Sequence, residues 1–255
     1  MPIQDPTPEE ARRLAGGPFG REMQNAILQY ARPIYWPKAL GRDPILSNGT
    51  TFFVDAGRGV FGVTAAHVYD GFVEVADRGV RCQIGSSNIL FDLRERLISK
   101  GRRVDIATYR ITAAEIATTG ATILTGAQST WPPKPPELDR GVLYGGFPGS
   151  DRRLLRPGHI EFGTFTALGV ASSISERDIS SQVERENLVA TMGLEVAPEG
   201  YDLGGLSGGP MLTVVQSQVV SWRLAGVVYR CSRAIGEIVV AARADFISPD
   251  GAVAE

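Results

Sequence analysis

From residue 47 onward, apolar and polar residues alternate one by one along short stretches of the chain. This period of two is the pattern of half-buried β-strands, and turn pairs such as Asn48-Gly49 and Asp70-Gly71 separate the stretches. In the first half of the chain we expect six strands, at 51–54, 60–64, 72–75, 80–84, 89–93 and 105–111. Six short strands at this spacing predict a β-barrel.

The same pattern returns in the second half, where the expected strands are 141–146, 159–170, 188–194, 210–215, 224–229 and 238–242. Residues 172–187 are charged and poor in apolar side chains, which predicts a surface loop. Between the halves, residues 132–136 contain four prolines, and such a segment is stiff and extended. We interpret 126–138 as a linker between two barrels, with a docking site for a proline-binding partner as the alternative.

Residues 1–45 lack the strand pattern and predict a partly helical extension. Thr7-Pro8-Glu9-Glu10 is typical of a helix start, and a second helix over 21–31 places Met23, Ile27 and Tyr30 on one face. That face either packs on a barrel or binds a regulatory partner. The expected domain organisation is an extension (1–45), a first barrel (46–125), the linker (126–138) and a second barrel with the C-terminal tail (139–255).

The candidate chemistry begins with the glycine-rich segment Gly204–Pro210, which contains Ser207. A serine hydroxyl becomes a useful nucleophile when a base takes its proton and hydrogen-bond donors receive the resulting negative charge. Glycines around Ser207 allow a sharp turn and a close approach of substrate to the backbone. The N–H groups of Gly205 and Ser207 are therefore candidates for an oxyanion hole, with a plain turn between two strands as the alternative.

A base and a group to orient it are both available. His67 lies at the end of a strand-like run, and Asp105 begins an alternating stretch. Because Asp105 is flanked by apolar residues, its burial is costly unless the carboxylate is hydrogen-bonded, and a histidine ring N–H is a suitable partner. Asp70 and Asp92 are rivals for the acid, the first in a turn and the second in a charged stretch. His159 is a rival base that would give a subtilisin-like order, but the helices of that fold are not predicted. Because no histidine follows Ser207, the order of the α/β-hydrolases is excluded.

The order His67, Asp105, Ser207 is that of the chymotrypsin template. Thr64-Ala65-Ala66-His67, Asp105-Ile106-Ala107 and Gly205-Leu206-Ser207-Gly208-Gly209-Pro210 resemble the three signature blocks of trypsin-like serine peptidases, over residues 46–248. The segment 145–149 is similar to one in bacterial HtrA-like peptidases. The resemblance implies an all-β fold of two six-stranded antiparallel barrels, with the catalytic residues His67, Asp105 and Ser207 in the cleft between them. It also implies a serine endopeptidase, with a catalytically silent binding module or an esterase as alternatives.

The same resemblance places a substrate pocket, although the sequence departs from the family near it. The residue six before the serine, Tyr201, falls at the pocket floor, beside Asp202. The walls fall at 229–231 and Gly236; residues 229–231 are Tyr229, Arg230 and Cys231. A tyrosine floor favours small or medium apolar side chains, whereas Asp202 favours basic ones. Leu206 stands where digestive members carry an acid that pairs with a new N-terminus, so an oxyanion hole here has to form by packing or respond to another trigger.

Composition narrows the setting of this chemistry. The chain has 255 residues, 43% of them hydrophobic and 21% charged, and a net charge of −2, which predicts a globular protein without affinity for nucleic acid or anionic membranes. The N-terminus lacks the pattern of a secretory signal, and only two cysteines occur, Cys82 and Cys231. We therefore expect free thiols in the cytoplasm, no metal or other cofactor, and a protein or peptide substrate.

Overall fold

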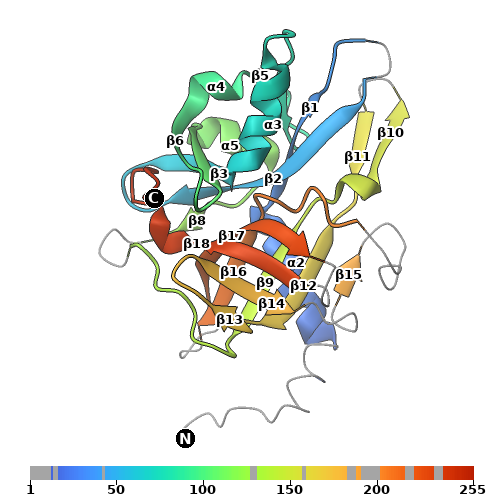
Figure 1. Ribbon diagram of the computed structural model, residues 1–255. Helices are drawn as coiled ribbons and strands as arrows, with labels where there is room; N and C mark the ends of the chain where they lie inside the picture. Colours follow the sequence, from blue (N-terminus) through green and yellow to red (C-terminus); the bar gives the residue numbers. More distant parts are fainter. Residues whose placement is uncertain are drawn as a thin grey trace, which may run out of the picture.

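The computed structural model describes residues 13, 17–41, 44–126, 131–156, 159–182, 188–190, 202–215, 221–232 and 238–255. Over these residues the chain forms two curled, antiparallel β-sheets and a few helices (Figure 1). This architecture agrees with the double-barrel, chymotrypsin-like fold expected from the sequence. Each sheet has eight described strands rather than the expected six.

The first sheet contains the strands that precede the proline-rich segment. Its strand order is β5-β4-β1-β2-β3-β7-β6, and β8 pairs in parallel with β2. The strands are β1 (Arg32–Pro37), β2 (Leu46–Asp55), β3 (Val60–Ala65), β4 (Cys82–Ile84), β5 (Leu90–Phe91), β6 (Leu97–Gly101), β7 (Ile106–Arg110) and β8 (Leu124–Thr125). Strand β1 lies within the extension expected at 1–45. The structure nevertheless includes it in the first sheet, where it pairs with β2 and β4.

The second sheet has the order β13-β14-β18-β17-β16-β9-β12-β15. Its strands are β9 (Gly141–Gly146), β12 (Phe165–Val170), β13 (Ser173–Ile174), β14 (Asp178–Gln182), β15 (Leu188–Ala190), β16 (Pro210–Val215), β17 (Ser221–Ser232) and β18 (Ile238–Arg243). A separate hairpin of β10 (Arg152–Arg156) and β11 (His159–Phe162) stands beside the first sheet (Figure 1). The expected loop at 172–187 is wrong in part, because Ile179 is fully buried and β14 pairs with β18.

Helices cover parts of both sheets. They are α2 (Pro18–Tyr30), α3 (Ala66–Ala76), α4 (Leu93–Arg96) and α5 (Ala113–Thr119), with short 3-10 turns η2 (Gly149–Asp151) and η4 (Ala244–Phe246). The strand expected at 72–75 is wrong, since these residues belong to α3. The buried residues of α3 recur at helical rather than strand spacing. The first helix expected near residue 7 lies outside the described residues apart from Arg13.

The face of α2 that carries Met23 and Ile27 is buried against the second sheet, within a core shared by both sheets. Strand β2 explains how that shared core arises. Phe53 points into the first sheet's own core, while Phe52 and Val54, on the opposite face, join residues of the second sheet such as Leu143. One face of β2 therefore looks across the junction between the two halves.

The C-terminal segment also crosses that junction. After η4 the chain returns to the first sheet, where Gly251 O accepts a hydrogen bond of 2.5 Å from Thr108 Oγ1 and Val253 N donates to Ser99 Oγ.

In the linker, Trp131 packs against the shared core. Among the described helices, none is long and apolar enough to cross a membrane.

Candidate active site

His67 lies in the first turn of α3, where the end of β3 turns into the helix. Its ring Nδ1 donates to Asp105 Oδ2 over 2.7 Å, and its backbone N–H donates to Asp105 Oδ1 over 2.9 Å. The carboxylate thus accepts from a free N–H at the helix N-terminus and from the imidazole at once. The His67 side chain stays 50% exposed, so the other ring nitrogen remains accessible.

Asp105 is held in this position by an unusual backbone conformation. Its φ of 51° is in the left-handed region, which aspartate and asparagine tolerate better than other side chains. Its carbonyl accepts a hydrogen bond from Ala66 N, 3.1 Å away. Asp105 therefore fixes the start of α3 through its backbone and its carboxylate. The rival acids have other partners: Asp70 pairs with Lys100, and Asp92 with Arg94.

Ser207 lies in the loop between Asp202 and β16, and the four successive carbonyls from Gly204 to Ser207 each have a donor. Gly204 O accepts from Gly149 N (2.6 Å), Leu206 O from Gly209 N (2.9 Å) and Ser207 O from Thr50 N (2.8 Å). Gly205 O accepts from the Thr50 hydroxyl over 2.7 Å. The planes of four successive peptides are thereby fixed.

Fixed peptide planes decide where the N–H groups of this loop point, because the C=O and N–H of a trans peptide point in opposite directions. The N–H groups of Gly204, Leu206, Gly208 and Gly209 all donate to protein oxygens. Within the described part of the chain, the N–H groups of Gly205 and Ser207 donate to none. These two donors are the ones that the sequence assigned to an oxyanion hole.

Leu206 anchors the loop by burial. It is 0% exposed and belongs to the core of the second sheet. The sequence left open whether an oxyanion hole forms here by packing or responds to another trigger, and the burial of Leu206 favours packing. Gly208 has a φ of +90° and lets the serine loop approach the backbone of the first sheet closely. A Cβ at this position would overlap Thr50 O and lie 3.0 Å from Ala65 N.

Truncating Leu206 to alanine is expected to destabilise the protein by about 2–5 kcal/mol, since the side chain is fully buried and leaves a cavity. Urea denaturation of Leu206→Ala and wild type measures the difference. Leu155→Ala is the matched control, because Leu155 is 56% exposed and its loss is expected to change stability by less than about 0.5 kcal/mol. Equal stabilities of Leu206→Ala and wild type would show that packing does not hold the loop.

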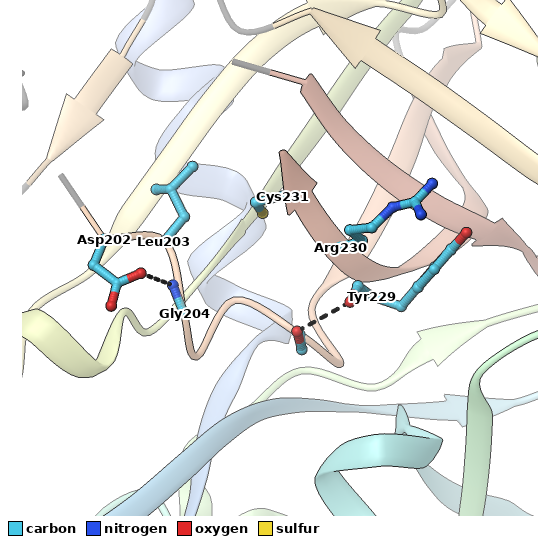
Figure 2. A pocket seen from close by; sticks show the side chains of 7 residues that line it. Asp202, Leu203, Gly204, Tyr229, Arg230 and Cys231 are labelled. Carbon is cyan, nitrogen blue, oxygen red and sulfur yellow. Dashed lines mark hydrogen bonds between the residues drawn. The ribbon is translucent and has the colours of Figure 1, made fainter. Parts of the chain in front are cut away.

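A pocket of about 280 Å³ opens beside Ser207. Figure 2 shows Asp202, Leu203 and Gly204 on one side, facing Tyr229, Arg230 and Cys231 of β17 on the other. Tyr201 and Gly236, which the sequence also assigned to a pocket, lie outside the described residues. Burial and Asp178, which accepts from the Tyr229 hydroxyl, raise the pKa of Tyr229, and the charge of Asp105 acts in the same direction.

The serine loop lies next to the start of α3. Gly208 contacts Thr64 and Ala65, which precede His67, and Gly49 packs between Val68 and the Ser207 carbonyl. The Ser207 hydroxyl itself donates to the carbonyl of Tyr229 over 3.3 Å (Figure 2), so its acceptor among the described residues is that carbonyl and not the imidazole. The structure thus brings His67 and Asp105 into contact and places Ser207 in the adjoining loop.

Two further residues of this region escaped the sequence interpretation. Thr50 and Asn48 of β2 contact the serine loop and the segment 147–149. In the sequence only Gly49 marks them, and the turn expected at Asn48-Gly49 is wrong, because both residues lie within β2. His159, the alternative base, is exposed on β11, and Asp105 bonds to His67 instead. The alternative triad with His159 is therefore contradicted. Among the described residues, no group of three or more His, Cys, Asp or Glu gathers as for a metal.

No family model and no curated protein matches this chain. Among solved structures, one similar chain comes from a study of how aromatic interactions drive the coupled folding and binding of the intrinsically disordered Sesbania mosaic virus VPg protein (TM-score 0.44, 12% identity, 86% of this chain and 94% of that chain covered). Another is the thermostable serine protease AL20 from an extremophilic microorganism (TM-score 0.46, 10% identity, 84% and 91% covered). One structural neighbour is thus a serine protease, at low sequence identity.

Proposed function

We propose that this protein is a serine endopeptidase that hydrolyses peptide bonds through an acyl-enzyme. The observation that carries the proposal is the pair of bonds from His67 to Asp105, with the Ser207 loop packed against Thr64 and Ala65, which precede His67. An imidazole held by a carboxylate through Nδ1 keeps its other nitrogen as a base for a serine hydroxyl.

In the proposed mechanism Ser207 Oγ attacks a substrate carbonyl while His67 takes its proton. The N–H groups of Gly205 and Ser207 hold the oxyanion, and their fixed peptide planes mean that little reorganisation accompanies the reaction. His67 then returns the proton to the leaving amine. Asp105 keeps the tautomer and stabilises the imidazolium, and water releases the acyl group by the same steps in reverse. A turn of the Ser207 hydroxyl from the Tyr229 carbonyl toward His67 begins the cycle.

The substrate is a protein or peptide whose side chain enters the pocket of Figure 2. The pocket carries one acidic and one basic residue, Asp202 and Arg230, and Asp202 Oδ1 already accepts from Gly204 N. Because these charges oppose each other, we propose a preference for small or medium apolar side chains over arginine and lysine. The location of the protein in the cytoplasm stays a prediction.

Cleavage of a peptide library by the purified protein tests the function directly. Cuts after small or medium apolar residues are expected, and a comparison of matched amide and ester substrates separates a peptidase from an esterase. A silent binding module is the second candidate, favoured by the bond from the Ser207 hydroxyl to the Tyr229 carbonyl instead of the base. Uncut library peptides together with a stably copurifying protein would establish that second function.

Modification by a thiol reagent tests whether the pocket is the substrate site, independently of any change to Ser207. A bulky maleimide that modifies Cys231 should block peptide hydrolysis, because Cys231 lines the pocket with Ser207. Cys82 is 0% exposed, and burial raises the pKa of its thiol, so it should not react in the folded protein. Mass spectrometry locates the modification and a peptide assay follows the rate.

Cys231→Ser is the control for that experiment. It should retain hydrolysis and become insensitive to the reagent. If wild type modified at Cys231 cleaved peptides at the unmodified rate, the pocket would not be the substrate site, although Ser207 could still be the nucleophile.

A further inference from the structure

The face of β2 that lies toward the junction carries the apolar residues Phe52 and Val54. Two polar residues, Asn48 and Thr50, precede them on the same face. Thr50 is 0% exposed. A buried hydroxyl in a core between two sheets is costly unless it is hydrogen-bonded, so its partners show what it does there.

Both partners of the Thr50 hydroxyl belong to the other half of the molecule. It donates to Gly205 O over 2.7 Å and accepts from Phe147 N over 3.1 Å. The Thr50 backbone N–H donates to Ser207 O, 2.8 Å away. Thr50 therefore contacts the serine loop on both sides of Leu206 and ties it to the segment that follows β9.

Asn48 continues this connection outward. Its Nδ2 donates to Phe147 O over 2.8 Å, and its Oδ1 accepts from Arg152 Nη1 over 2.6 Å. The same segment supplies Gly149 N, which donates to Gly204 O. The peptide that carries the Gly205 N–H is thus fixed by a segment that Thr50 and Asn48 hold in place.

We propose that Thr50 is a positioning residue for catalysis. From the opposite barrel, its hydroxyl holds the peptide that lies between the Gly205 and Ser207 N–H groups, and also the segment 147–149 that bonds to Gly204 O. The inference rests on the proposed function, because it assigns these N–H groups to the oxyanion. Thr50 contacts no reacting atom. It acts through the loop, and misplacement of catalytic groups by about 1 Å is enough to slow a reaction on the order of 10²-fold.

The neighbouring residue, Thr51, provides a matched control. Thr51 is equally buried at 0% exposure, and its hydroxyl also makes two bonds, with Val63 O (2.8 Å) and Tyr109 Oη (2.7 Å). It points to the opposite face of β2 and touches neither the serine loop nor segment 147–149. Valine has nearly the shape of threonine, so replacing either threonine by valine removes one buried hydroxyl and changes little else.

The experiment compares wild type, Thr50→Val, Thr50→Ser and Thr51→Val in thermal unfolding, peptide hydrolysis and the rate of labelling by a fluorophosphonate. Thr50→Val is expected to lower kcat on the order of 10²-fold with KM unchanged, since the oxyanion forms only after substrate binding. Thr50→Ser keeps the hydroxyl and should restore kcat. Thr51→Val should lose stability to a similar extent but keep kcat.

Each other result overturns the inference. If wild type reacts and Thr50→Val has the wild-type kcat, the positioning role is absent while the proposed function stands. An equal loss of kcat in Thr50→Val and Thr51→Val shows a general effect of destabilisation. If folded wild type neither reacts with the probe nor cleaves peptides, the proposed function fails and the inference fails with it. Should Thr50→Val not fold, Asn48→Ala replaces it, with a smaller loss of kcat expected and a wild-type kcat counting against the inference.

Discussion

Replacing Ser207 by alanine is expected to lower kcat for peptide hydrolysis on the order of 10⁶-fold and to abolish labelling by a fluorophosphonate. The hydroxyl is the only group of the serine side chain that can form the acyl-enzyme, and alanine retains the backbone N–H that is proposed to hold the oxyanion. Because Ser207 Oγ makes one bond of 3.3 Å, to the Tyr229 carbonyl, its removal should hardly affect stability. Kinetics with the best library peptide and thermal unfolding measure both effects.

His67→Ala should reduce kcat by a similar factor, because the hydroxyl then lacks a base. The double variant is expected to be no slower than either single one, since the two residues act as a unit. His159→Ala is the control, because His159 is the second histidine of the chain and is exposed on β11. Labelling of Ser207→Ala at the wild-type rate would remove Ser207 from the role of nucleophile.

Replacing Asp105 by asparagine is expected to lower kcat on the order of 10⁴-fold. The asparagine oxygen can still accept from His67 N, and its NH₂ group then faces the ring Nδ1. That nitrogen must become the acceptor, which puts the ring proton on Nε2, where the serine hydroxyl needs a base. The kcat for amide substrates, with KM measured in parallel, tests this expectation.

Asparagine is chosen because of the backbone at this position. At a φ of 51° asparagine is tolerated, whereas alanine would add strain and confuse a chemical effect with a structural one. Asp70→Asn is the matched control, since Asp70 lies on α3 beside Lys100 and makes no bond to His67. A wild-type kcat for Asp105→Asn would show that the carboxylate caps α3 without orienting a catalytic base.

Local sequence patterns predicted much of the fold. The bounds expected for β9 and β16 are confirmed, and β3, β17 and β18 differ by a few residues at their ends. The prediction failed where a short window matched two periods. Phe72 and Val75 fit a strand when taken with their nearest neighbours, but together with Val68, Tyr69 and Ala76 they follow the spacing of a helix.

The sequence by itself determined which side chains carry the candidate chemistry, because an imidazole, a carboxylate and a hydroxyl within small or glycine-rich segments are local features. The tertiary structure alone decided how they are held. The Asp105 carboxylate at the start of α3, the Thr50 hydroxyl at Gly205 O and the Tyr229 carbonyl at Ser207 join residues 38, 155 and 22 positions apart. The alternation of residues along a strand states which face is buried, but it does not state what lies opposite that face. The partners of Asp105 and Ser207 are therefore fixed only when each sheet folds, and those of the Thr50 hydroxyl only when the two sheets pack together.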